Sequence, residues 1–119
     1  MKKKLVYIVH PIKGDVMDNV ERILRIVRDI NLNCKNVIPF APYLADVLAL
    51  NDDNPEERKR GIRNDKYILA SGIVDEIWVY GDRVTQGMSD EIKLAFKLDI
   101  PIVTVSRAIS GAVINQLPI

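Results

Sequence analysis

Apolar and polar residues alternate along the chain in blocks that predict strands followed by helices. The run Lys4–Val9 is apolar after its first residue, which is typical of a short buried strand. After the turn HPIKG, apolar residues recur at helical spacing and predict a helix: Val16, Val20, Ile23, Leu24, Val27 and Ile30. The segment Asn36–Phe40 is predicted to form a second strand, which Pro39 and Pro42 bring to an end.

The next segment carries the residues that favour a helix start. Asn54 is suited to cap, Pro55 suits the first helical position, and Glu57 falls three residues after the cap. We expect this helix to run to about Ser71, where Gly72 ends it. A strand, a helix and a last strand are then predicted, at Asp75–Tyr80, roughly Met88–Leu98 and Ile100–Val105. Strands that alternate with helices predict an α/β fold: an open parallel sheet flanked by helices, a flavodoxin/Rossmann-like three-layer sandwich.

In two segments the apolar residues do not recur at a clear helical or strand period. The loop APYLADVLALNDDN, residues 41–54, is expected to contain one or two helical turns, and loops of this length are usually functional or mobile. The tail Ser106–Ile119 is expected to form an edge strand or a subunit contact.

Length and charge exclude several classes of protein. With 119 residues the chain predicts one domain, residues 1–119, and 17 basic against 16 acidic residues give no field that favours a nucleic acid polymer or a membrane. The first apolar run is too short for a signal peptide, so a cytoplasmic protein is expected. The single cysteine, Cys34, reads as an ordinary thiol near a helix end. Because no zinc pattern or Walker loop appears, neither a metal nor a cofactor is expected.

The fold class indicates where a site would lie. Ligands bind outside the carboxyl ends of parallel strands, which here are followed by His10–Asp15, Ala41–Asp46 and Gly81–Gly87. Asp75 lies at the opposite end of its strand, so we expect a turn or capping role for it.

Two acids are predicted to face inward. Glu91 shares a helix face with Met88, Ala95 and other apolar residues, and Asp65 lies three and four residues from the apolar positions of its own helix. Taken alone, each acid has a simpler explanation. Glu91 could be there because a negative charge is stabilised by the positive end of the helix dipole, and Asp65 could form an ion pair with Arg63 or Lys66. Together they favour a site, because an ionised Glu is a suitable nucleophile toward a sugar carbon and a buried acid is a suitable proton donor.

The segments YIVHPIKGD and VTQGMSDEIKLAFKLDIPIV resemble the nucleoside 2-deoxyribosyltransferase-like superfamily, including its deoxynucleoside monophosphate N-glycosidase branch and uncharacterised phage and bacterial relatives. Gly87 and Glu91 match the spacing of its Gly-x-x-x-Glu motif. The resemblance implies that Glu91 is the nucleophile, that Tyr7 positions it, and that Asp65 protonates the departing base. Hydrolysis follows if water is the acceptor, and exchange follows if a second base is.

The resemblance also implies a set of substrate-binding residues: His10, Pro11, Lys13, Gly14, Tyr43, Asp82, Thr85, Gly87 and Met88. Thr85 and Lys13 match phosphate ligands of the monophosphate branch, with Gly14 contributing backbone N–H groups, although Lys13 alone would read as a solvated loop residue. Tyr43 either stacks on a base or packs in the core. Asp82 either touches the ligand or only makes the turn.

His10 replaces the small residue usual in the first motif, and it either narrows the sugar pocket or serves a different ligand group. The expected function is N-glycosidic cleavage or deoxyribosyl transfer on a nucleoside or nucleoside 5-monophosphate. The alternatives are a non-catalytic protein that senses or sequesters a nucleotide-derived ligand, and a structural subunit with a vestigial pocket. The resemblance further implies a homo-oligomer with shared sites, to which Ser106 or Ser110 could contribute.

Overall fold

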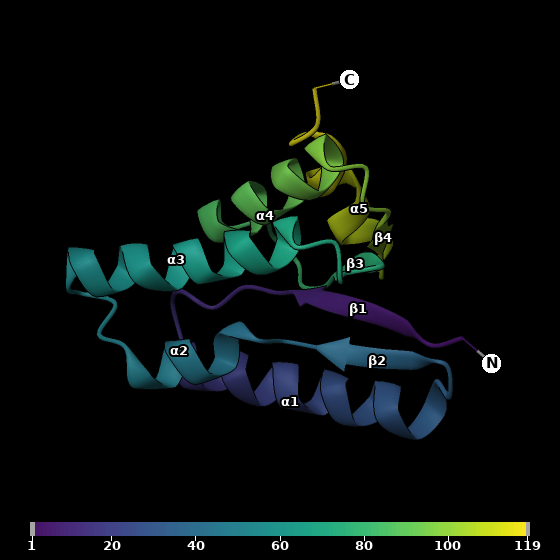
Figure 1. Cartoon of the computed structure of the whole chain (residues 1–119), viewed down its shortest axis with the longest axis horizontal. Coiled ribbons are helices and arrows are strands. Elements are labelled where there is room, and N and C mark those ends of the chain that lie inside the picture. Colours follow the sequence, from purple (N-terminus) through teal and green to yellow (C-terminus); the bar gives the residue numbers. More distant parts are fainter. Residues whose placement is uncertain (1, 119) are drawn as a thin grey trace.

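The computed structural model describes residues 2–118; the two ends of the predicted domain, Met1 and Ile119, lie outside the described residues. Its centre is a four-stranded sheet in the order β2-β1-β3-β4, in which all neighbouring strands are parallel (Figure 1). The strands are β1 (Lys4–Val9), β2 (Val37–Phe40), β3 (Glu76–Val79) and β4 (Ile102–Thr104). The predicted fold class is confirmed.

Strand β1 is central because its residues are apolar on both faces. Val6 and Ile8 pack with Ile30 of helix α1 (Val16–Asn33), which covers one face of the sheet. Tyr7 and Val9 point to the other face, where the main core forms. That core includes buried residues of α3 (Pro55–Ala70), α4 (Gln86–Lys97) and α5 (Arg107–Ile114). The alternation of side chains along a strand thus assigns the residues of β1 to two different layers.

The caps predicted for the third helix are confirmed. The Asn54 side chain accepts hydrogen bonds from the backbone N–H groups of Glu56 and Glu57, and Pro55 occupies the first helical position. The predicted helical turns in the loop 41–54 are also present, as helix α2 (Tyr43–Ala49). Cys34 is the C-terminal cap of α1, near a helix end as expected.

Two element predictions are corrected. Helix α4 begins at Gln86 rather than near Met88, because the Thr85 hydroxyl accepts a hydrogen bond from the backbone N–H of Met88 and so caps the helix two residues earlier. The tail forms α5 instead of an edge strand. Ser106 caps α5, and Ile109 and Val113, four residues apart, are both buried.

The chain order places two loops side by side. From β1 the chain moves to β2 at one edge of the sheet and then returns to β3 on the other side of β1. The carboxyl ends of β1 and β3 therefore flank the switch point at which ligands of such sheets bind. Asp75, just before β3, exchanges hydrogen bonds with Leu5 of the neighbouring strand β1: its side chain accepts from the N–H of Leu5, and its own N–H donates to the Leu5 carbonyl. Between residues 2 and 118 no helix is both long and apolar enough to cross a membrane.

Candidate functional site

A tyrosine and a glutamate from distant parts of the chain meet beneath the carboxyl end of the sheet. The hydroxyl of Tyr7, which is completely buried on β1, donates a hydrogen bond to Oε2 of Glu91 on α4. Glu91 faces the sheet because it lies one turn from the buried residues Met88 and Ala95. It is the sixth residue of α4, beyond the first turn, so attraction to the helix dipole does not explain its position.

The ring of Tyr43 packs beside the ring of Tyr7. Its hydroxyl donates a hydrogen bond of 2.6 Å to the backbone carbonyl of Ile8, and its ring lies 5.8 Å from the ring of Tyr7. Only 7% of Tyr43 is exposed, yet the residue also lines the pocket that contains Glu91. It therefore packs in the core and lines the pocket at the same time.

A pocket of about 250 Å³ opens above Glu91. Its walls come from the β1–α1 loop, α2, residues 57–66 of α3 and the first turns of α4. It brings together most of the site residues that the sequence predicted: His10, Lys13, Tyr43, Asp65, Thr85, Gly87, Met88 and Glu91. The two carboxylates predicted to face inward thus share one cavity.

Burial changes the acidity of both carboxylates. It raises the pKa of Glu91 to about 8, with the nearby charges of Asp65 and Asp90 acting in the same direction and the Tyr7 hydrogen bond opposing them. Burial also raises the pKa of Asp65 to about 7, reinforced by the charge of Asp46. The Tyr7 hydroxyl has a pKa far above its ordinary value because it is buried beside Glu91, so it stays protonated and donates to the Glu91 carboxylate.

Asp65 has no basic partner among the residues that the structure describes. Within residues 2–118 its carboxylate forms no ion pair, either with Arg63 or with Lys66. Its partly buried carboxyl group therefore faces the pocket with its hydrogen-bonding capacity uncommitted.

The remaining predicted residues lie elsewhere. Pro11 and Asp82 line a second pocket, which lies next to the first one and shares His10 with it. Gly14 lines neither of these two pockets; it turns the β1–α1 loop with φ of 111°, a conformation that favours glycine. Asp82 lies 3.7 Å from the guanidinium of its neighbour Arg83.

Thr85, Gly87 and Lys13 shape the end of the pocket near α4 and the first loop. The Thr85 hydroxyl accepts from a backbone N–H but retains its own proton for a ligand. Apart from Gly87 itself, its chain neighbours and the adjacent helix backbone, no atom of the described residues lies within 4 Å of the place where a side chain on Gly87 would begin, so the backbone there is open to a ligand. Lys13 is exposed, and within the described part of the chain it forms no ion pair.

The predicted set of site residues omitted Asp46. Asp46 lies on α2, lines the pocket, and accepts a hydrogen bond of 3.0 Å from the Asn64 side chain of α3. It follows Tyr43 by three residues and so lies on the same face of α2, a spacing visible in the sequence. Asp52 and Arg58 form an ion pair of 3.0 Å and also line the pocket. Among residues 2–118 no cluster of three or more His, Cys, Asp or Glu side chains is arranged to hold a metal ion.

Three comparisons place the chain among known proteins. The family model described as "Domain of unknown function (DUF7768)" matches residues 4–105. A 2-deoxyribosyltransferase from the psychrotolerant bacterium Bacillus psychrosaccharolyticus has a similar structure, with a TM-score of 0.58 and 17% sequence identity. The match covers 84% of this chain and 70% of that one. No curated protein matches significantly. At this identity the structural likeness shows a shared fold.

Proposed function

The chain belongs to the family described as a domain of unknown function (DUF7768), and we propose that it cleaves or exchanges the N-glycosidic bond of a nucleoside or nucleoside 5-monophosphate. The observation that carries this proposal is the hydrogen bond from Tyr7 to Glu91 in a pocket that Asp65 also lines. A positioned carboxylate and a second acid are the two groups that glycoside transfer with retained configuration needs. The shared fold with a 2-deoxyribosyltransferase supports the same class of chemistry.

In the first step Glu91 attacks the anomeric carbon of the sugar. A bond forms between a carboxylate oxygen and that carbon, the bond from the carbon to the base nitrogen breaks, and Asp65 gives its proton to the departing base. The Tyr7 hydrogen bond holds the Glu91 carboxylate in position for attack. In the second step Asp65 takes a proton from water, or from the nitrogen of a second base, which attacks the glycosyl-Glu91 ester and frees the carboxylate.

The ends of the pocket differ in chemistry, and this orients the substrate. Lys13, Thr85 and the open backbone at Gly87 supply donors and would hold the 5-monophosphate. Asp65 and Asp46 lie on the α2–α3 side and would face the base. The sugar then lies between these ends, above Glu91.

One observation favours binding without turnover as a second candidate function. Because the pKa of Glu91 is about 8, its carboxyl group is largely protonated at pH 7 in the free protein, and a protonated carboxyl is a poor nucleophile. A protein that only binds a nucleotide-derived ligand would retain the pocket without needing the ionised form.

The test is release of free base from a panel of deoxy- and ribonucleosides and their 5-monophosphates, with and without a second free base, followed by chromatography. Glu91→Gln should abolish release, whereas Glu21→Gln, an exposed glutamate on α1, should behave as the wild type. Release that survives Glu91→Gln would refute the proposed mechanism. Retention of a nucleotide without turnover would assign the binding function instead.

A further inference from the structure

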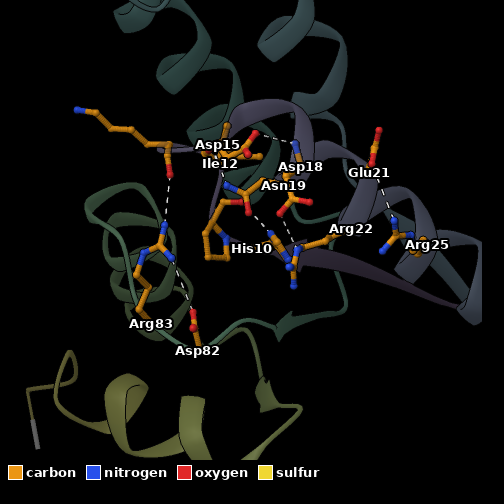
Figure 2. Close-up of polar contacts among 12 residues, drawn as sticks. His10, Ile12, Asp15, Asp18, Asn19, Glu21, Arg22, Arg25, Asp82 and Arg83 are labelled. Atoms are coloured by element: carbon orange, nitrogen blue, oxygen red, sulfur yellow. Dashed lines mark hydrogen bonds and ion pairs between the residues drawn. The ribbon is translucent and has the colours of Figure 1, made fainter.

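The second pocket lies at the switch point of the sheet, on the other side of the β1–α1 loop from Glu91. Its volume is about 450 Å³, within the range of roughly 300–1,000 Å³ that is usual for ligand sites. Figure 2 shows its polar side chains, which come from the first loop, the start of α1 and the β3–α4 loop. Its lining residues are His10, Pro11, Asp15, Asp18, Asn19, Arg22, Gly81, Asp82 and Arg83.

The loop His10–Asp15 forms a ridge between the two pockets. Ile12 and Lys13 line the Glu91 pocket, Pro11 and Asp15 line the second pocket, and His10 lines both. Arg83 ties the ridge to the β3–α4 loop, because its Nη2 donates to the carbonyl of Lys13 at 3.3 Å. A single ligand that crosses this ridge would enter both pockets.

The second pocket presents both cations and carboxylates to a ligand. Arg22 and Arg83 lie on either side of His10 (Figure 2). The Nε of Arg22 donates to Asp18 at 2.9 Å, and its two terminal nitrogens form no hydrogen bond within residues 2–118. The carboxylates are those of Asp15, Asp18 and Asp82. Guanidinium groups suit phosphate, and carboxylates suit the hydroxyls of ribose, so this mixture fits a ribosyl phosphate better than a simple anion.

His10 adds a buried acceptor to this wall. Only 8% of the residue is exposed, and its Nδ1 lies 2.7 Å from the carbonyl oxygen of Pro11. A carbonyl only accepts, so Nδ1 carries the proton and Nε2 of the neutral ring is left as an acceptor. Burial lowers the pKa of His10, which maintains the neutral form. A neutral acceptor of this kind suits a sugar hydroxyl.

The ridge itself can hold a phosphate group that links a ligand part in one pocket to a ligand part in the other. Lys13 and Gly14 are exposed on it, and α1 begins directly after it. The Asp15 side chain accepts a hydrogen bond from the backbone N–H of Asp18. The backbone N–H groups of Val16 and Met17 have no partner among the described residues. A helix start that follows the first strand of such a sheet is the usual place for a pyrophosphate.

We propose that the ligand is a pyrophosphate-linked dinucleotide, with one nucleoside lobe in the Glu91 pocket, the pyrophosphate across Lys13 and Gly14, and the second ribosyl lobe in the pocket of Arg22 and Arg83. This inference rests on the proposed function only for the occupant of the Glu91 pocket. It concerns binding and involves no additional chemical step.

Calorimetric titration with adenosine monophosphate, adenosine diphosphate and diadenosine diphosphate separates the contributions. The dinucleotide is expected to bind about tenfold or more tightly than the monophosphate, with the diphosphate between them, since charge-assisted hydrogen bonds of the Arg type contribute on this scale. Equal affinity of the diphosphate and the dinucleotide would overturn the proposal, because the second nucleoside would then add nothing. Absence of binding by all three would also overturn it.

Arg22→Gln provides the decisive variant, because it should reduce the ratio of diphosphate to dinucleotide dissociation constants to about one. Arg25→Gln is the matched control: Arg25 lies on the same helix, approaches Glu21 at 3.9 Å, and does not line the pocket. It should retain the wild-type ratio. A ratio that survives Arg22→Gln refutes the second lobe. Base release by the wild type tests the proposed function separately, so the two can fail independently.

Discussion

The hydroxyl of Tyr7 donates a hydrogen bond to the carboxylate of Glu91, joining the central strand to α4 across 84 positions of the chain. This bond stabilises the ionised form of a carboxyl group whose burial raises its pKa. Tyr7→Phe should therefore raise the pKa of Glu91 further. A hydrogen bond to a charged group contributes about 1.5–3 kcal/mol, or roughly one to two pKa units.

The alkaline limb of the pH–rate profile reports the higher of the two carboxyl pKa values, which is that of Glu91, so in Tyr7→Phe this limb should move to higher pH by about that amount, with a lower rate at pH 7. Phe40→Leu is a suitable control, because the Phe40 ring forms a T-shaped pair with the Tyr7 ring, with centroids 6.5 Å apart, and Phe40 does not line the Glu91 pocket. An unchanged alkaline limb in Tyr7→Phe would show that the hydrogen bond does not control ionisation of Glu91.

The wild-type pH–rate profile should be bell-shaped, with its maximum between about 7 and 8, since these are the pKa values of Asp65 and Glu91. Below this range both carboxyl groups are protonated and no nucleophile is present. Above it both are ionised and no proton donor remains. A rate that rises monotonically from pH 5 to pH 9 would exclude the paired roles.

Asp46→Asn should move the acidic limb of that profile to lower pH, because this limb reports the lower of the two pKa values, that of Asp65. The negative charge of Asp46 raises the pKa of Asp65, so its removal lets Asp65 lose its proton sooner, by roughly half to one pH unit. Asp52→Asn serves as the control, because Asp52 also lines the pocket but pairs with Arg58. Identical shifts in the two variants would mean that the effect is one of general charge.

Stability should fall as pH rises through the range in which Asp65 and Glu91 ionise. Their pKa values in the folded protein exceed the ordinary values of 3.8 and 4.5, so the folded state binds these protons more tightly than the unfolded state. Their stabilising effect is complete below about pH 4 and is lost as pH approaches 8. Glu91→Gln removes one of these groups and should raise Tm at pH 8 by a few degrees, on the order of 1–2 kcal/mol after solvent screening.

Thermal unfolding of wild type and Glu91→Gln at pH 5 and pH 8 measures this difference. The variant should gain stability relative to wild type only at the higher pH. A gain of equal size at both pH values would indicate a packing effect in place of a titration.

Lys13 should determine the preference for a phosphorylated substrate. Lys13→Gln is expected to lower the ratio of kcat/KM for the 5-monophosphate to that for the nucleoside by about tenfold, since one charge-assisted contact is lost. Lys66→Gln is the matched control, because Lys66 lines the same pocket beside Asp65. A ratio that is the same in Lys13→Gln as in the wild type would place the phosphate elsewhere.

Helical periodicity made the inward placement of Glu91 and Asp65 predictable. Each acid lies three or four residues from apolar side chains, and that spacing determines the face of a helix. The start of α3 was equally predictable, because Asn54 and Pro55 act through local backbone geometry.

The local sequence pattern did not predict the structure correctly where elements are short or where the chain leaves a strand. Helix α5 has eight residues, too few to display a clear period, although Ser106 signals its start. Pro11 and Asp82 follow strand ends as the sheet rule requires, but the rule does not say on which side of the first loop they lie. Only the folded chain shows that the loop divides the edge into two pockets.

A trapped sugar on Glu91 would test the proposed nucleophile directly. A 2-deoxy-2-fluoro nucleoside of the base that the protein releases fastest should slow breakdown of the intermediate, because fluorine destabilises an oxocarbenium-like transition state. Intact-protein mass spectrometry should then show an increase by one fluorinated sugar, mapped to the peptide that contains Glu91 and absent in Glu91→Gln. Release of base with no adduct, or an adduct on another residue, would contradict the assignment of Glu91 as nucleophile.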